Sequence, residues 1–263
     1  MENFLFFAPR TRKVYPIKPE LLGKFEPVRI LTKDCVKLYG WFIKPKQNLP
    51  IIMFCHGQSE NISKWQDSAI FLEKLGFGAL FFSYRGHYKS AGRPSEEGIY
   101  MDAETMIDFL KKKGCSTQDI VIWGRSLGSC IACEMALRHN LKGIILESSI
   151  LNITSASTSL KDWYIKQFNL NIFKDLINKA FEKIDFIQKF ENDKKIEKIK
   201  CPILIIHSQN DVKIHYSIAQ KLHKLNPQST LYISDKGEHN TNDWCFEKVN
   251  EFLVSLSKEK VNI

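Results

Sequence analysis

The stretch IVIWGRSLG, residues 120–128, joins a short apolar run to the motif G-x-S-x-G. Residues 120–123 are typical of a buried strand, and helix-forming residues follow Ser126. A serine between a strand and a helix is predicted to occupy a strained turn, in which glycine neighbours prevent side-chain clashes. The motif alone arises by chance in about one protein of this length in ten, so its setting makes it informative.

Apolar runs and amphipathic stretches alternate along the rest of the chain. Residues 28–32 and 36–43 predict a strand pair. Buried strands are expected at 51–55, 79–83, 120–123, 143–146, 203–207 and 230–234. Helices are expected at about 64–75, 97–113, 126–139, 214–225 and 243–256, the first beginning in a capping box of Ser63 and Gln66. This alternation predicts an α/β fold, with a mostly parallel central sheet and helices on both faces.

One segment interrupts the alternation. Residues 148–199 are rich in aromatic residues and lysine and are longer than a simple crossover requires. We expect residues 1–263 to form a single domain, with 148–199 as a small helical cap inserted over the strand ends. Trp163 and Phe168 are expected to face an apolar pocket, the alternative being that the cap aromatics pack among themselves.

A serine hydroxyl needs a base that takes its proton, and an acid that orients the base. His239 follows the last expected strand, and Asp211 directly follows the strand 203–207. Both positions lie after strand carboxyl ends, where α/β proteins bind their ligands. Glu147 also ends a strand and is the alternative acid. Among the other histidines, His207 is a candidate to support the acid.

The oxyanion of an acyl-transfer reaction needs two hydrogen-bond donors. The backbone N–H of Leu127, directly after the serine, is one candidate. The second is the N–H of Gln58, because Gly57 lets the chain turn after the strand 51–55. His56 is assigned a role in bracing this loop.

The composition is that of a globular protein, and the excess of charge is positive. The net charge is +9, from 38 basic and 29 acidic residues, with 44% hydrophobic residues. Lysines outnumber arginines by 31 to 7, which argues against a nucleic-acid partner, since arginine provides the bidentate contacts to phosphates and bases. The seven cysteines are odd in number and several lie in apolar runs, which favours free thiols and a cytoplasmic protein.

The remaining features suggest few partners beyond a substrate. The apolar run at residues 4–8 precedes basic residues and is too short to span a membrane. Packing onto the domain is its expected role, and peripheral membrane contact is the alternative. No spacing of metal ligands appears, so no metal or organic cofactor is expected. The expected partner is a small-molecule or acylated substrate, and the oligomeric state is left open.

Taken together, His56-Gly57, Tyr84-Arg85-Gly86, the motif at 124–128, Asp211 and His239 resemble the α/β-hydrolase superfamily. The stretches 83–86 and 92–98 are similar to a small-capped branch that includes serine-aminopeptidase-like hydrolases and the α/β-hydrolase-domain depalmitoylases. The resemblance covers about residues 28–256. It implies that Ser126 is the nucleophile, Asp211 the acid and His239 the base, with the oxyanion bound by Gln58 and Leu127.

The sequence departs from that branch at Tyr88, where glycine is usual, and in having no cysteine-rich N-terminal tail. Both departures argue against a palmitoyl-protein substrate. The resulting expectation is a serine hydrolase that cleaves a carboxylic ester or thioester through an acyl-enzyme. A peptidase or amidase of the same fold, and a catalytically inactive binding module, are the alternatives.

Overall fold

The computed structural model describes residues 13–46, 49–58, 60–182, 186–239, 241 and 243–258. Its centre is an eight-stranded sheet in the order β1-β2-β4-β3-β5-β6-β7-β8. The strands are β1 (Glu26–Leu31), β2 (Lys37–Ile43), β3 (Ile51–Cys55), β4 (Gly78–Ser83), β5 (Ile120–Arg125), β6 (Gly143–Glu147), β7 (Ile203–Ser208) and β8 (Thr230–Ser234). β2 pairs antiparallel with β1 and β4, and the remaining pairs are parallel.

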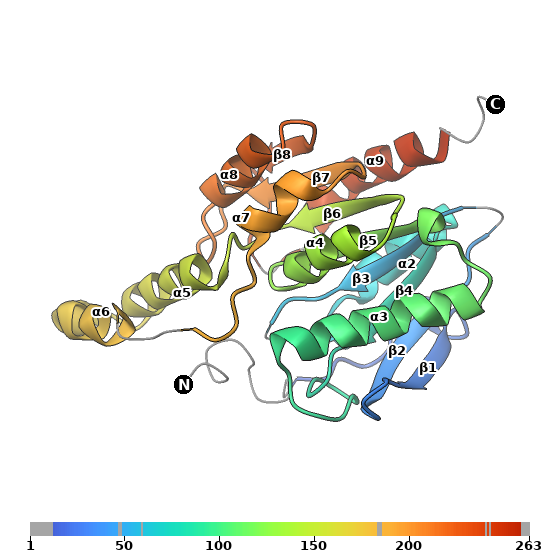
Figure 1. Cartoon of the computed structure of the whole chain (residues 1–263), viewed down its shortest axis with the longest axis horizontal. Coiled ribbons are helices and arrows are strands. Elements are labelled where there is room, and N and C mark those ends of the chain that lie inside the picture. The colour runs from blue at the N-terminus through green and yellow to red at the C-terminus, as the bar shows by residue number, and fades with distance from the viewer. Residues whose placement is uncertain are drawn as a thin grey trace.

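Helices cover both faces of this sheet (Figure 1). The helices α3 (Glu96–Lys112), α4 (Gly128–Arg138) and α8 (Ser217–Leu225) share one apolar core, and α2 (Gln66–Leu75) and α9 (Phe246–Lys258) share the other. β5 serves both cores, because Ile122 belongs to the first and Trp123 to the second. A strand buried on both faces needs apolar residues at every position, which explains the continuous run of 120–123.

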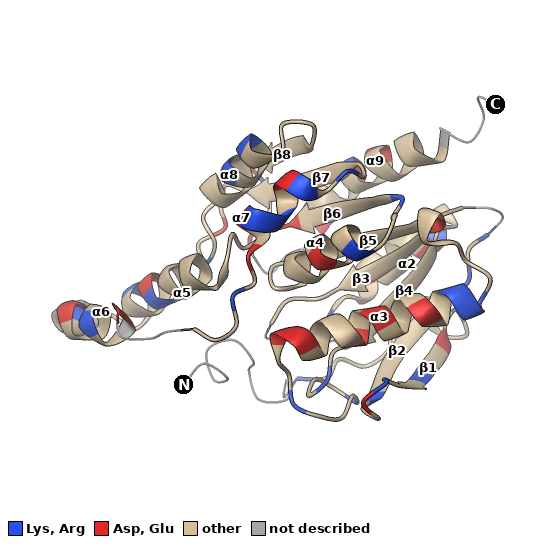
Figure 2. Cartoon of the chain, in the orientation of Figure 1, with Lys and Arg blue, Asp and Glu red and all other residues tan. Residues whose placement is uncertain are grey.

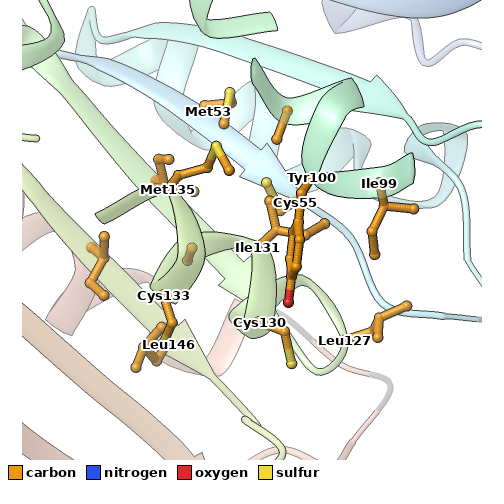
Figure 3. Close-up of a cluster of buried hydrophobic side chains, with 14 of the residues drawn as sticks. Met53, Cys55, Ile99, Tyr100, Leu127, Cys130, Ile131, Cys133, Met135 and Leu146 are labelled. Atoms are coloured by element: carbon orange, nitrogen blue, oxygen red, sulfur yellow. The ribbon is translucent and has the colours of Figure 1, made fainter. Parts of the chain in front are cut away.

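The first core is dense and contains sulfur as well as hydrocarbon (Figure 3). Cys130 and Cys133 lie on α4, where both are fully buried free thiols. Burial raises the pKa of Cys130 to about 12. A thiol held in its protonated form packs as a small apolar group and is a poor nucleophile.

The α/β fold with its mostly parallel sheet is therefore confirmed, with small differences at the element ends. The expected capping box at Ser63 is wrong. A 3₁₀ turn, η2 (Ile62–Lys64), precedes α2, and the Asn61 side chain accepts the Ser63 N–H at 2.9 Å. The Ser63 hydroxyl also turns back to Asn61, so α2 begins without a side-chain cap. Gly76 ends α2 in the left-handed conformation.

The segment between β6 and β7 carries the helices α5 (Ile153–Gln167), α6 (Lys174–Glu182) and α7 (Asn192–Lys195) and the 3₁₀ turns η4 (Asn171–Phe173) and η5 (Ile196–Lys198). α5 and α6 extend beyond the sheet (Figure 1). Basic and acidic residues are mixed on both helices (Figure 2).

The remaining elements are the 3₁₀ turns η1 (Pro19–Leu21), η3 (Thr117–Asp119) and η6 (Asp243–Cys245). Among the described residues, no helix is both long and apolar enough to cross a membrane. The N-terminal run at residues 4–8 lies outside the described residues.

Candidate active site

Ser126 lies in a strained turn between β5 and α4. Its φ angle is +50°, a left-handed conformation that side chains other than glycine rarely adopt. The glycines of the motif permit this turn through close contacts. A Cβ at Gly124 would lie 2.3 Å from the Gly128 carbonyl oxygen, and a Cβ at Gly128 would lie 1.9 Å from the Cys55 carbonyl oxygen. Ser126 is partly exposed, while Arg125 before it and Leu127 after it are buried.

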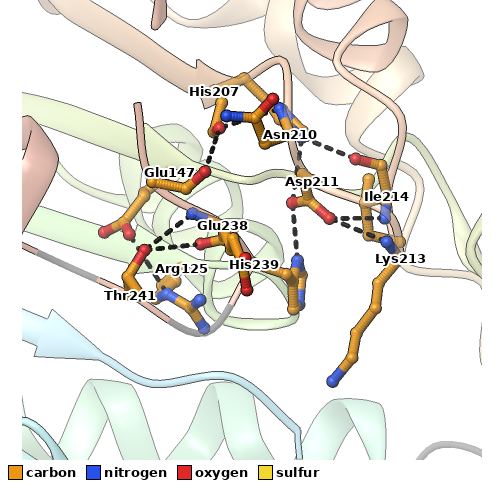
Figure 4. A network of polar contacts seen from close by, with 12 residues as sticks. Arg125, Glu147, His207, Asn210, Asp211, Lys213, Ile214, Glu238, His239 and Thr241 are labelled. Atoms are coloured by element: carbon orange, nitrogen blue, oxygen red, sulfur yellow. Dashed lines mark hydrogen bonds and ion pairs between the residues drawn. The ribbon is translucent and has the colours of Figure 1, made fainter. Parts of the chain in front are cut away.

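Asp211 and His239 meet at the carboxyl ends of β7 and β8 (Figure 4). The His239 Nδ1 lies 2.7 Å from the Asp211 Oδ2. The other carboxylate oxygen, Oδ1, accepts the backbone N–H groups of Lys213 and Ile214 at 3.0 and 2.9 Å. These contacts fix the carboxylate with Oδ2 directed at the His239 imidazole.

The charge of Asp211 is also stabilised by a second histidine. His207 Nε2 lies 2.9 Å from the Ile214 carbonyl oxygen and 3.3 Å from Oδ2. Burial would raise the pKa of Asp211, but hydrogen bonds from His207 and His239 hold it well below its usual range. His207 thus supports the acid. Asp211 is therefore ionised at neutral pH.

For the His239 imidazole, burial is the dominant influence on the pKa. It lowers the pKa of His239, and the hydrogen bond and charge of Asp211 reverse this only in part. The neutral ring therefore dominates at neutral pH. With Nδ1 directed at a carboxylate, the proton resides on Nδ1 and Nε2 remains a free base.

Three side chains contact the carbonyl oxygens of the loop after β3. The His56 Nδ1 lies 2.7 Å from the Gly57 oxygen, and the Tyr84 hydroxyl donates to the His56 oxygen at 2.7 Å. The His87 Nε2 lies 3.0 Å from the Gln58 oxygen. His56 also stacks on Tyr84 with ring centroids 4.1 Å apart, so its side chain braces the loop, as expected.

Glu147, the alternative acid, is directed away from the imidazole (Figure 4). It accepts the Trp123 indole N–H at 2.8 Å and the Arg125 Nε at 3.2 Å. The guanidinium of Arg125 also contacts Glu60. Glu60 and Arg125 were not predicted as site residues, although Arg125 directly precedes Ser126 and Glu60 lies three residues after Gly57.

A pocket of about 50 Å³ joins these groups. Ser126, His239, Gln58 and Leu127 all line it. Its other walls are Gly57, Glu60, Arg125, Ile150, Ala156, Leu160, Lys213 and Ile214. The structure therefore brings four of the five expected site residues to one pocket, and Asp211 reaches that pocket through His239.

A larger cavity of about 550 Å³ shares Lys213 with this pocket. Trp163 of α5 lines the larger cavity, and its ring lies 5.1 Å from the Lys213 Nζ. Phe168, expected to face the pocket together with Trp163, is 62% exposed and stacks on Tyr164 instead. The expectation for Phe168 is therefore wrong.

The family model described as serine aminopeptidase, S33, matches residues 46–195 of this chain. The matched range is more than half of the chain and includes the motif around Ser126. Asp211 and His239 lie beyond it.

Curated relatives extend the likeness over most of the chain. The α/β-hydrolase domain-containing protein WAV2 of Arabidopsis thaliana is 29% identical, covering 96% of this chain and 86% of that protein. The lysophosphatidylserine lipase ABHD12 of Danio rerio is 30% identical over 72% of this chain, which spans only half of the lipase's length.

Solved structures agree on the fold. An α/β-hydrolase of Vibrio vulnificus superposes with a TM-score of 0.78 at 23% identity, covering 97% of this chain and 91% of that one. An esterase of Pyrococcus furiosus gives 0.74 at 21% identity, covering 96% and 98%.

Proposed function

Because this chain belongs to the serine aminopeptidase (S33) family of α/β-hydrolases, we propose that it is a serine hydrolase that cleaves carboxylic esters or thioesters through an acyl-enzyme. The observation that carries the proposal is the pocket lined by both Ser126 and His239, whose imidazole is bonded to buried Asp211 at 2.7 Å. A base, its orienting acid and a strained serine are the parts that nucleophilic catalysis requires.

In the proposed reaction, the Ser126 Oγ attacks the substrate carbonyl and the His239 Nε2 takes the hydroxyl proton. The resulting imidazolium is stabilised by Asp211. The proton then passes to the leaving group, whose bond to the carbonyl carbon breaks and leaves an acyl-serine. Water, deprotonated by His239, attacks that ester and releases the acid and the free hydroxyl.

Two backbone N–H groups stabilise the negative charge on the tetrahedral intermediate. Leu127 precedes α4, where the first N–H groups have no partner within the helix and the helix dipole favours an anion. Gln58 supplies the second donor from a loop whose carbonyl oxygens are already held. Loss of one such donor costs other enzymes about 10²–10³ in turnover.

The pocket at Ser126 accommodates only a small part of a substrate. The cavity of about 550 Å³ beyond Lys213 is suited to the remainder, and the segment 148–199 then acts as a cap that sets specificity. A lipid-like ester is favoured over a peptide by Trp163 in the larger cavity and by Ala156 and Leu160 of α5 in the pocket at Ser126, and one relative is a lysophosphatidylserine lipase. A cytoplasmic location and a substrate that is not a nucleic acid remain parts of the proposal.

The test is a panel of chromogenic esters, thioesters and aminoacyl amides of graded chain length. The proposal expects ester and thioester turnover that is lost in Ser126→Ala. Faster cleavage of aminoacyl amides would support the peptidase alternative. No turnover of any substrate, together with failure to react with an activated ester, would support the inactive binding module.

A further inference from the structure

The proposed function places the two oxyanion donors on separate loops. Gln58 follows β3 and Leu127 follows β5, and these two strands are paired in parallel from Ile51 to Cys55. The donors are effective only within a few tenths of an ångström of their best position. A contact that joins the loops directly would fix their separation.

A buried ion pair provides that contact. The Arg125 Nη1 lies 3.0 and 3.1 Å from the two carboxylate oxygens of Glu60. The side chains of Arg125 and Glu60 are only 1% and 6% exposed. The guanidinium also bonds to Glu147 and lies 4.4 Å from the ring centroid of Trp65, so it has little freedom to move.

The ion pair bears on the oxyanion loop itself. The Gly57 N–H donates to the Glu60 Oε2 at 3.2 Å. A Cβ at Gly57 would lie 2.9 Å from that oxygen and 3.5 Å from the Arg125 Nη1. A side chain at 57 would displace the Glu60 carboxylate, so glycine lets the pair lie against the backbone. The contact thus runs from the residue before Gln58 to the residue before Ser126.

Stability alone is a weak reason for this pair. Two charges removed from water recover little net free energy, and apolar residues of similar size often replace them without loss. The Arg125 Nη2 is buried and has no hydrogen-bond partner among the residues that the structure describes, which adds to the cost. Such an arrangement calls for a role other than stability.

We propose that Glu60 and Arg125 are positioning residues, and that their ion pair is a strut that sets the separation of the two oxyanion donors. The inference rests on the proposed function and deepens it. Neither residue exchanges a proton with the substrate. Burial would raise the pKa of Glu60, but Arg125 and Lys64 hold it at about 2, so Glu60 is ionised at neutral pH.

The test compares Glu60→Gln with Asp102→Asn. Asp102 is also fully buried and bonded to an arginine, Arg85, at 2.8 Å, but it does not line the pocket of Ser126. Both variants neutralise a buried carboxylate without changing its shape. If the ion pair sets the separation of the donors, Glu60→Gln should lower kcat by about tenfold to a hundredfold and change KM by no more than about twofold. Asp102→Asn should leave both constants nearly unchanged.

A tetrahedral mimic supplies the second readout. Inhibition by a trifluoromethyl ketone should weaken in Glu60→Gln by the same factor as kcat, because the mimic needs both donors. If Glu60→Gln does not fold, Glu60→Asp, which keeps the charge but shortens the strut, should show the same loss. The strut is refuted if Glu60→Gln matches Asp102→Asn in kcat and in inhibition. It is also refuted if Glu60→Gln changes only the midpoint of the pH profile of kcat/KM.

Failure of the strut and failure of the proposed function give different results. A wild-type protein that does not react with a fluorophosphonate at Ser126 contradicts the proposed function. A wild-type protein that is labelled and active, beside a Glu60→Gln variant with unchanged kcat, contradicts the strut alone.

Discussion

The floor and the roof of the pocket are built differently. The floor, formed by residues 56–58, 60 and 124–128, is held by glycine contacts, buried ion pairs and bonded carbonyl groups. The roof is formed by α5. α5 and the chain that continues from it leave many large apolar side chains in solvent, namely Tyr164, Phe168, Ile172, Phe173, Leu176 and Ile187. A rigid floor suits a fixed reaction, and a loosely packed roof suits variation in substrate. Changes in the floor should therefore alter rate, and changes in the roof should alter preference.

The largest effect is expected at the acid. Asp211→Asn removes the charge that stabilises the imidazolium and should lower kcat by up to about four orders of magnitude. Glu147→Gln should affect turnover far less, because Glu147 bonds to Trp123 and Arg125 rather than to His239. Steady-state kinetics on an activated ester compares the two, and the reverse ranking would move the acid to Glu147.

Gly128→Ala tests the rigidity of the floor. The added Cβ would lie 1.9 Å from the Cys55 carbonyl oxygen, and neither backbone can move without disturbing the turn at Ser126. We expect a loss of about 3 kcal/mol or more in the free energy of unfolding, measured by urea denaturation. A variant as stable as the wild type would show that the turn can relax.

Trp163→Ala tests the roof, with Phe168→Ala as its control. Trp163 lines the larger cavity, so its loss should change the ratio of kcat/KM for long and short acyl esters by about tenfold. Phe168 is exposed, and its removal should leave the ratio unchanged. Equal profiles in both variants would exclude α5 from substrate selection.

The pH dependence should be the smallest effect. The base works only when neutral, so kcat/KM should fall as the pH drops through the pKa of His239. Burial lowers that pKa below its ordinary 6.5, so the acid limb should have its midpoint below pH 6.5. In Asp211→Asn, the negative charge that raises the pKa of His239 is lost, so the midpoint of the acid limb should fall further. A wild-type midpoint above 6.5 would contradict the buried, neutral imidazole.

The sequence predicted the parts of the molecule that local chemistry determines. The order of strands and helices follows from apolar periodicity, and the turn at Ser126 follows from its glycines. The meeting of Asp211 and His239 was predicted because both follow strand carboxyl ends. Tyr88, which stands where glycine is usual in the related branch, adopts a φ of +47°, in the left-handed region that favours glycine.

The parts that the sequence did not predict depend on side-chain direction and on contacts between distant residues. Nothing local distinguishes Trp163, which lines the cavity, from Phe168, which faces solvent. The pair of Glu60 and Arg125 joins residues 65 positions apart. At Ser63, two local hydrogen bonds with Asn61 competed with the expected cap.

The most direct test of the account is reaction with a fluorophosphonate, followed by mass spectrometry of the labelled peptide. The account predicts one label per protein, attached to Ser126, and none in Ser126→Ala that has the thermal stability of the wild type. Label on another residue, or label that persists in Ser126→Ala, would contradict the assignment of Ser126 as the nucleophile.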